Sequence, residues 1–356
     1  MKHSVFMIAA SFAALTIWAC ATGARTPAWE QANPIEPLPE PPLGLDQKFT
    51  DLARENQPTP ERVRLGRWLF YDTRLSVDNT VSCASCHHPQ HGFSEQTPHS
   101  TGIKGQEGTR KAPSFLNQAW TLYPNFFWDG RAQSLEEQAL GPVANPIEMG
   151  STHDAMLQTL DGIPGYRRYF KEAFGTEEIT KDRVAKAIAD YERTCMSGDS
   201  AWDRWKKNRD ESAVSDEVKL GDAVFFGKGA CNQCHLGQSL TDSSFHNVGV
   251  GYNAESGTFA DEGRYVVTKK PEDRGAFKTP GLRDVALRAP YMHDGSVPTL
   301  RAVVEHYNQG GIANPALDPK MKKLNLSEAE ITALVKFMEA LNGNNPRETA
   351  PTAFPQ

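Results

Sequence analysis

Two pentapeptides of the form Cys-x-x-Cys-His carry the most specific chemistry in the sequence, at residues 83–87 and 231–235. In this pattern the two thiols can add to the vinyl groups of a haem while the adjacent imidazole binds the iron, which is how c-type haem is attached. A zinc site built from the four cysteines would leave both histidines without a role. The sequence therefore predicts two covalently bound haems c. The residues expected to hold them are Cys83, Cys86, His87, Cys231, Cys234 and His235.

The segments around the two pentapeptides repeat each other, which indicates an internal duplication. Before each pentapeptide lies a similar octapeptide, VRLGRWLF at 63–70 and VKLGDAVF at 218–225. After each one comes an aspartate–glycine turn, WDG at 128–130 and HDG at 293–295, followed at the same spacing by Ser-Leu or Thr-Leu. The order expected in each half is therefore a helix, the pentapeptide, a loop, the turn and two more helices.

The elements predicted around these motifs are helices and loops, with almost no alternating strand pattern. Thr59 before Pro60 is a typical helix start, and the SxxE sequences that begin at Ser134 and Ser327 are typical of capping boxes. We expect an all-α, loop-rich fold of two tandem c-type cytochrome domains related by the duplication, each binding one covalent haem. The expected domains are residues 47–205 and 206–343.

The two ends of the chain are expected to lie outside these domains. Residues 1–21 combine a lysine, an apolar run and a small-x-small ending, as a signal peptide does, so we expect export to the periplasm. Residues 22–46 contain six prolines and are expected to form an extended, solvated leader, and residues 344–356 a flexible tail. Attachment to a membrane is expected only if Cys20 carries lipid, an alternative that its sequence context fits poorly.

Composition narrows the possible partners and fits a haem protein. The 356-residue chain has a net charge of −6 and a pI near 6.0, without the basic surface that nucleic-acid binding requires, so no nucleic acid is expected. The hydrophobic fraction of 39% is low for a chain that must form two hydrophobic cores, and two haems would supply the missing apolar surface. Outside the pentapeptides, Cys20 belongs to the signal peptide and Cys195 to an apolar helical stripe, so no disulfide is expected.

The ligand on the far side of each iron decides what a haem can do. Downstream of the second pentapeptide, Leu300, Val304 and Tyr307 share one face of an expected helix. His306 lies about 100° away from that face. A tyrosine phenolate is an accepted haem ligand, so Tyr307 is a candidate sixth ligand. A tyrosine packed in the core is the alternative interpretation.

The duplication gives a different expectation for the first haem. The position equivalent to Tyr307 is Pro142, which cannot bind iron, so this haem is expected to keep an open position for a small molecule. Gln138 lies on the inward side of the same helix, and Glu148 follows it. A carboxylic acid beside an open ferric haem can shuttle the proton needed to split an O–O bond, although a surface carboxylate is the alternative. The competing ligands, expected on a solvated loop, are His88, His91 and His99.

With these residues assembled, residues 47–343 resemble the bacterial di-haem cytochrome c peroxidase and MauG family. The resemblance rests on both pentapeptides and on FFWDGRAQSLEEQ, NPIEM, FHNVG and TPGLRDVALRAPYMHDG, which begin at positions 126, 145, 245 and 279. It implies a peroxidatic haem in the N-terminal domain and an electron-transferring or charge-storing haem in the C-terminal domain. Trp128 matches the tryptophan that passes electrons between the haems. The residues that match the pocket for hydrogen peroxide are Gln138, Pro142 and Glu148.

The sequence also departs from the pattern of this family. Classical members have a methionine ligand where this chain has Tyr307, and a histidine that blocks the N-terminal haem where it has Ile103. Both changes point to the MauG-like branch, whose N-terminal haem is open without prior reduction. The asparagine that binds calcium between the haems is replaced by Lys111, whose ammonium can take the place of the cation, so calcium is doubtful. Gly229 replaces a tryptophan near the haem that faces the substrate of MauG, which weakens the case for that substrate.

The function expected from these residues and this resemblance is that of an exported di-haem peroxidase. It would reduce hydrogen peroxide at the N-terminal haem, store or relay electrons at the second haem, and draw them from a small redox protein or a protein substrate. The alternatives are an ordinary cytochrome c peroxidase, with reduced cytochrome c or cupredoxin as donor, and a non-catalytic di-haem electron carrier. Trp202 and Trp205 are candidate surface relays, but a tryptophan pair beside two lysines is typical of amphipathic packing.

Overall fold

The structure is a computed structural model that describes residues 26–53, 56–121, 123–344 and 348–356. The expected signal peptide and Cys20 therefore lie outside the described residues. Within the described part of the chain, no helix is long and apolar enough to cross a membrane.

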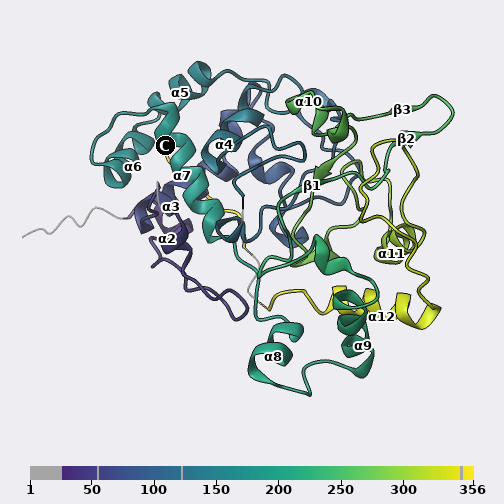
Figure 1. Cartoon of the computed structure of the whole chain (residues 1–356). Coiled ribbons are helices and arrows are strands. Elements are labelled where there is room, and N and C mark those ends of the chain that lie inside the picture. Colours follow the sequence, from purple (N-terminus) through teal and green to yellow (C-terminus); the bar gives the residue numbers. More distant parts are fainter. Residues whose placement is uncertain (1–25, 54–55, 122, 345–347) are drawn as a thin grey trace, which may run out of the picture.

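Helices dominate the structure, and the two halves of the chain lie on opposite sides of it (Figure 1). The helices before residue 200 are α1 (Ala28–Ala32), α2 (Phe49–Leu52), α3 (Pro60–Tyr71), α4 (Leu135–Ala144), α5 (His153–Asp161), α6 (Pro164–Phe174) and α7 (Lys181–Thr194). Those that follow are α8 (Ala201–Asn208), α9 (Asp216–Phe226), α10 (Tyr265–Thr268), α11 (Leu300–Asn308) and α12 (Glu328–Glu339). Two-residue strands form two antiparallel pairs, β1 (Phe245–His246) with β4 (Phe277–Lys278) and β2 (Tyr252–Asn253) with β3 (Thr258–Phe259). The expectation of a mostly α-helical, loop-rich fold is confirmed.

In each half, the helix before the pentapeptide crosses the last helix of that half at close range, α3 on α7 and α9 on α12. Gly66 lies at the first crossing, where a Cβ atom would stand 1.8 Å from the carbonyl oxygen of Ala187. Gly221 lies at the second crossing, where a Cβ atom would stand 2.0 Å from the carbonyl oxygen of Ala333. A side chain at either position would push the helices apart, so the two glycines set the crossings. Equivalent crossings are what the predicted duplication requires.

Each helix crossing lies inside its own apolar core. The N-terminal core contains the fully buried side chains of Trp68, Phe70 and Tyr191, together with Cys195, which is buried as expected. The C-terminal core is a separate cluster, and Phe225, Leu334 and Phe337 lie at its centre. Both pentapeptides touch these clusters, because Cys83 packs on the first and Cys231 on the second. The cores therefore support each pentapeptide independently.

The predicted helix starts are largely confirmed. The Thr59 side chain accepts a hydrogen bond from the backbone N–H of Arg62, and Ser327 forms a full capping box with Glu330. Ser134 caps α4 as expected, but the predicted box is only half formed. The Glu137 carboxylate accepts instead from the backbone N–H of Gln133, at 2.7 Å.

The boundary expected between residues 205 and 206 falls inside α8. The Trp202 ring of this helix packs against Phe337 of α12, and Lys206 forms an ion pair with Asp222 of α9 at 2.7 Å. The backbone N–H of Trp202 also donates to the carbonyl of Ala340, at 3.2 Å. The structure thus places α8 with the C-terminal half, which moves the boundary to the segment before residue 201.

The proline-rich leader is anchored at a few positions where the structure describes it. The Trp29 indole donates to the Tyr169 hydroxyl at 2.7 Å, and the buried Asn33 amide donates to the Arg64 carbonyl at 3.0 Å. Leu45 is also buried. Single side chains therefore anchor a segment that has no regular apolar pattern, while much of residues 26–46, including the stretch 34–37, is exposed to solvent as expected.

The end of the chain differs from the expected flexible tail in the same way. Residues 348–356 lie against the N-terminal half, where the Trp68 indole donates to the carbonyl of Ala353 at 3.2 Å. The N–H of Gly165 donates to the carbonyl of Gln356 at 2.8 Å. Most of the contacts use backbone carbonyls, which any residue supplies, so composition gave no signal of this docking.

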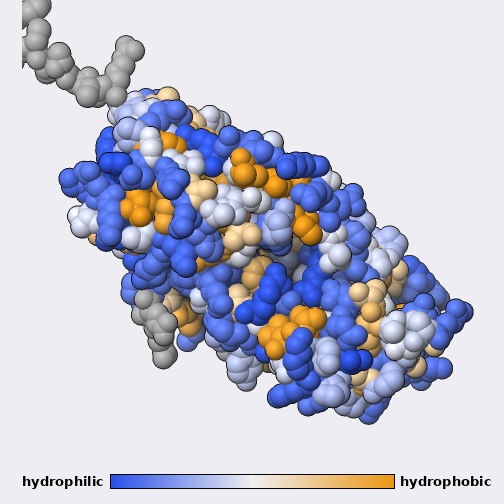
Figure 2. Space-filling view, turned by 90° about the horizontal axis from the view of Figure 1, so that it is seen from above, coloured by the Kyte–Doolittle hydropathy of each residue, from blue (hydrophilic) through white to orange (hydrophobic). Residues whose placement is uncertain are grey.

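The molecular surface carries no large apolar face in the view of Figure 2. The molecule is elongated in this view, mostly hydrophilic, and its hydrophobic residues form small separate groups. Dispersed apolar side chains of this kind are ordinary on a protein surface. Those with the largest exposed fractions are Val77, Tyr123, Ile35, Val266 and Leu220.

Candidate functional site

The two histidines of the pentapeptides are held in the same way. The Nδ1 atom of His87 lies 3.0 Å from the carbonyl oxygen of Phe93, and that of His235 lies 3.1 Å from the carbonyl oxygen of Leu240. Phe93 and Leu240 both adopt left-handed backbone conformations, with φ of 55° and 53°, which turn these carbonyls toward the rings. An imidazole that donates through Nδ1 leaves its Nε2 lone pair free for a metal. Burial lowers the pKa of both rings, which favours this neutral form.

The four thiols of the pentapeptides are free and half-buried, on the short 3-10 helices that precede the two histidines. Because none of them forms a disulfide, all four thiols remain available for thioether bonds. Each pentapeptide thus presents two thiols and one oriented imidazole, the set that covalent haem attachment needs.

A cavity of about 760 Å³ opens beside His87. Its wall includes Cys86 and His87 of the first pentapeptide, and its volume falls within the usual range for cofactor sites. Loop residues of the C-terminal half close the opposite side, among them Thr241 and Lys278. The cavity therefore lies between the halves. The expected peroxide-pocket residues Gln138, Pro142 and Glu148 all line it.

Glu148 is half-buried in the cavity wall. Burial raises the pKa of its carboxyl above the ordinary range, while Arg131 and a hydrogen bond from Asn145 oppose that rise. The Asn145 amide donates to the Glu148 carboxylate at 2.8 Å, which fixes the direction of the side chain. A fixed carboxyl with a raised pKa is suited to accept and return a proton. The alternative of a freely solvated surface carboxylate does not hold.

Among the described residues, His87 is the only histidine that lines this cavity, and no methionine or tyrosine lines it. His88, His91 and His99, the competing ligands considered from the sequence, lie outside its wall. Ile103 is buried in the N-terminal core, and its N–H donates to the carbonyl of Glu148 at 2.9 Å. The loop around Ile103 is therefore held against the Glu148 segment and brings no ligand to the cavity.

Lys278 is a half-buried residue of this site that the sequence did not suggest. Its ammonium lies 5.1 Å from the centre of the Phe126 ring and has no ion pair or hydrogen bond among the described residues. Burial alone lowers the pKa of Lys278 to about 8. A partly desolvated cation without a counter-ion fits a haem, because the propionates of a haem are carboxylates. The missed signal was the duplication, which pairs Lys278-Thr-Pro with Lys111-Ala-Pro.

Trp128 lies where the halves meet. Its indole donates to the carbonyl of Lys111 at 2.8 Å, and its own carbonyl accepts from the N–H of Lys278 at 2.8 Å. The equivalent residue of the other half, His293, accepts in turn from the N–H of Lys111 at 2.8 Å. These reciprocal backbone bonds hold the two halves together on both sides of the cavity.

Lys111 is also buried at this junction. Its ammonium donates to the backbone carbonyls of Glu95 and of Thr97, the latter at 3.2 Å. Carbonyl oxygens are ligands that calcium also uses, so the ammonium occupies two acceptors of the kind that a calcium ion would need. Burial lowers the pKa of Lys111 to about 8.

Tyr307 lies in the last turn of α11 and is half-buried. Burial raises the pKa of its phenol, and the thiols of Cys234 and Cys231 contribute to the same rise. The neighbouring His306 is already engaged, because its Nε2 atom lies 2.9 Å from the carbonyl oxygen of Val248. Of the two candidate ligands on this helix, His306 is therefore already bonded within the protein, and Tyr307 remains the candidate ligand.

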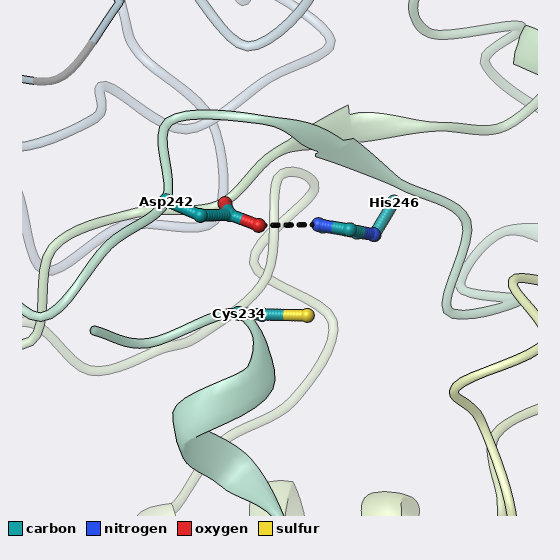
Figure 3. Close-up of side chains that lie close together, drawn as sticks. All are labelled: Cys234, Asp242 and His246. Carbon is teal, nitrogen blue, oxygen red and sulfur yellow. Dashed lines mark hydrogen bonds and ion pairs between the residues drawn. The ribbon is translucent and has the colours of Figure 1, made fainter.

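A second cluster with metal-binding residue types lies next to Cys234. In Figure 3 the side chains of Asp242 and His246 face each other, with the sulfur of Cys234 nearby. The two His246 nitrogens lie 2.8 Å from Asp242 and 2.5 Å from Asp318, and these contacts help to raise the pKa of His246 to about 10. A doubly hydrogen-bonded, protonated imidazole has no lone pair for a metal. The cluster therefore acts as a charge-paired support for the loop and does not form a metal site.

Comparison with known proteins identifies relatives with the same arrangement. The profile of the di-haem cytochrome c peroxidase family matches residues 60–211. Methylamine utilization protein MauG of Methylorubrum extorquens is 41% identical over 84% of this chain and 83% of its own length. Cytochrome c551 peroxidase of Nitrosomonas europaea is 39% identical over 83% of this chain and 85% of its own length.

Solved structures agree with these relatives. A MauG-like protein associated with microbial copper homeostasis superimposes with a TM-score of 0.76, at 30% identity, over 86% of this chain and 93% of that one. The diheme peroxidase BthA of Burkholderia thailandensis shares the fold, with a TM-score of 0.71. Membership favours an enzyme over the non-catalytic electron carrier considered from the sequence. The chain belongs to the di-haem cytochrome c peroxidase family and is, as a member, a peroxidase-type oxidoreductase with two c-type haems.

Proposed function

We propose that this chain is a MauG-like di-haem peroxidase that reduces hydrogen peroxide in its N-terminal half. One haem would be held by Cys83, Cys86 and His87, and the other by Cys231, Cys234, His235 and Tyr307. When bound, the first haem supplies the iron on which peroxide is bound and reduced. Lys278 is positioned to pair with a haem carboxylate in the cavity.

The observation that carries this proposal is the composition of the cavity beside His87. It has a fixed carboxyl, Glu148, and among the described residues it offers no second histidine, methionine or tyrosine to block the iron. Glu148 takes a proton from the bound peroxide and returns it to the leaving oxygen, and Gln138 orients the substrate by hydrogen bonding. Pro142 leaves room on the same wall, because it has neither a ligand atom nor a backbone N–H.

Electrons must reach the N-terminal half from elsewhere in the molecule. Trp128 is bonded through its indole to one half and through its carbonyl to the other, so it offers a path between the haems. Tyr307, an anionic ligand when bound to ferric iron, favours high oxidation states of the second haem. That haem would serve to store or relay electrons, and a redox protein or a protein substrate, which is itself oxidised, would replace them.

Electron paramagnetic resonance of the purified diferric protein tests these assignments. We expect one high-spin signal from the open haem and one low-spin signal from the haem bound by His235 and Tyr307. Tyr307→Phe should change the low-spin signal only, and His306→Phe, on the same helix, should change neither. A low-spin signal that is identical in Tyr307→Phe contradicts the ligand assignment.

A second candidate function is that of an ordinary cytochrome c peroxidase. It is favoured by the 39% identity to a cytochrome c551 peroxidase, which nearly equals the 41% identity to MauG. The two functions differ in where the electrons come from. Steady-state turnover with reduced cytochrome c or a cupredoxin, without modification of a co-expressed protein, would establish the second function. Peroxide-dependent oxidation of a partner protein would establish the first.

We further propose that the protein is exported to the periplasm, where covalent haem attachment takes place. The support is the sequence of residues 1–21. Cell fractionation and the mass of the mature protein test this proposal. Cleavage after residue 21 is expected, whereas a mass increase from lipid at Cys20 would show membrane anchoring.

A further inference from the structure

Trp202 lies on α8, half-buried against the C-terminal core. Its indole Nε1 donates to the Asp222 carboxylate at 2.8 Å. Asp222 is only 7% exposed and forms its ion pair with the Lys206 ammonium at 2.7 Å. One edge of an oxidisable ring thus faces a buried carboxylate, while the residue itself keeps contact with solvent.

Aromatic rings connect Trp202 to the second pentapeptide. The Trp202 ring centre lies 6.0 Å from that of Phe337, which lies 4.8 Å from that of Phe225. The Phe225 ring in turn lies 6.4 Å from that of His235. Both phenylalanines are buried, so the series between the indole and the imidazole runs through the C-terminal core. Side chains packed in this way support electron tunnelling between the two ends.

We propose that Trp202 is a one-electron relay between the second haem and the protein surface. This inference rests on the proposed function, because the second haem must be oxidised after peroxide has reacted. Position 229, two residues before the second pentapeptide, could have held a relay. It is occupied by glycine, which has no side chain that can be oxidised. Trp202 stacks on Phe226, at the end of α9 that leads to the same pentapeptide, with the ring centres 6.3 Å apart.

The relay step balances with groups that the structure contains. The Trp202 indole loses one electron to the peroxide-oxidised protein, and its Nε1 proton moves along the existing hydrogen bond to Asp222. An electron from the external donor and the return of that proton restore the indole. Arg283, whose guanidinium carbon lies 5.5 Å from the centre of the indole ring, disfavours a positive charge on the ring. The loss of the proton to Asp222 is therefore an essential part of the oxidation.

Trp205, on the same helix, is a matched control. It is also half-buried, but its indole donates to the carboxylate of the exposed Glu211 at 3.2 Å. The Lys206 ammonium lies 4.4 Å from the centre of its ring and disfavours oxidation. Trp205 does not belong to the ring series that leads to His235. The two indoles thus differ in the contacts that the relay requires.

The test uses the loaded protein, one equivalent of hydrogen peroxide and no donor. Peptide mapping by mass spectrometry should find oxidised Trp202 in the wild type, and freeze-quenched electron paramagnetic resonance should find a tryptophan radical. In Trp202→Phe, the radical and the oxidised peptide should be lost and the two-electron-oxidised state should decay severalfold more slowly. Trp205→Phe should behave as the wild type. An unchanged radical and decay rate in Trp202→Phe would overturn the relay.

A second variant tests the proton transfer from Trp202 to Asp222 separately. Asp222→Asn keeps an acceptor oxygen for the indole but removes the carboxylate, so the decay should slow severalfold and the wild-type solvent deuterium effect should disappear. A wild-type rate and isotope effect in this variant would also contradict the proposal. The initial absorbance change on mixing with peroxide distinguishes a failure of the proposed function from a failure of the Trp202 relay. If the wild type shows no such change, the proposed function fails; if the change is normal in all variants, only the relay is under test.

Discussion

Replacing Glu148 by Gln should nearly abolish the reaction with peroxide while leaving the protein intact. The amide oxygen of Gln can still accept the hydrogen bond that Asn145 donates at 2.8 Å, so the side chain should keep its direction. What the variant loses is the ability to take a proton and return it. Proton transfer by a positioned side chain contributes about a hundredfold to ten-thousandfold in rate, which corresponds to roughly 3–5 kcal/mol of barrier.

The dependence on pH sharpens this prediction. Burial raises the pKa of Glu148, and only its ionised form can accept a proton from peroxide. In the wild type, the second-order rate constant should therefore fall as pH falls through a pKa above the ordinary glutamate range. In Glu148→Gln this inflection should vanish.

Stopped-flow absorbance of the diferric protein with excess hydrogen peroxide gives both the rate constant and its pH profile. Glu137→Gln is the control, because this exposed glutamate lies on α4, the helix that precedes Glu148, and outside the cavity wall. It should react at the wild-type rate. Wild-type rates in Glu148→Gln, with both haems bound, would refute the reasoning that assigns the proton to this carboxyl.

Four further predictions follow from the structure. Lys278→Met should leave both haems attached but shift the reduction potential of one of them, measured by spectroelectrochemistry, because a partly desolvated cation is removed from the cavity. Incubation with EDTA should leave the reaction with peroxide unchanged, because Lys111 donates to carbonyl acceptors between the halves; loss of activity that calcium restores would contradict this. Truncation after residue 347 should lower the melting temperature measured by circular dichroism, because Trp68 and other residues of the N-terminal half lose their partners in 348–356. Gly221→Ala should destabilise the C-terminal half by more than about 1 kcal/mol in denaturant unfolding, since a Cβ would stand 2.0 Å from a backbone oxygen.

The sequence was sufficient for the parts of the fold that depend on short patterns. The helix starts at Thr59 and Ser327 followed from capping residues, and the inward positions of Gln138 and Glu148 from the comparison of the two halves. The pentapeptides alone predicted covalent haem attachment, because this spacing of two thiols and an imidazole has few other uses in proteins. These signals are local, so they do not depend on how distant segments pack.

The remaining features depend on contacts between distant segments. The leader and the tail were expected to be loose because they lack apolar periodicity, yet Asn33 and Ala353 form hydrogen bonds with residues of α3. Helix α8 was divided by the expected boundary, since only its packing against α9 and α12 shows to which half it belongs. Lys278 could be recognised only through its duplicated counterpart Lys111, and its lack of a counter-ion in the cavity wall appears only when the halves meet.

The central claim is that the N-terminal haem is open in the resting protein and that the second haem, with Tyr307, shares the oxidation. The most direct test is the absorbance and electron paramagnetic resonance spectrum of the diferric protein before and after one equivalent of hydrogen peroxide, with no donor. The account predicts a high-spin signal at rest, its loss on mixing, and a long-lived two-electron-oxidised protein. Two low-spin haems at rest, and no reaction until one haem is reduced, would contradict it.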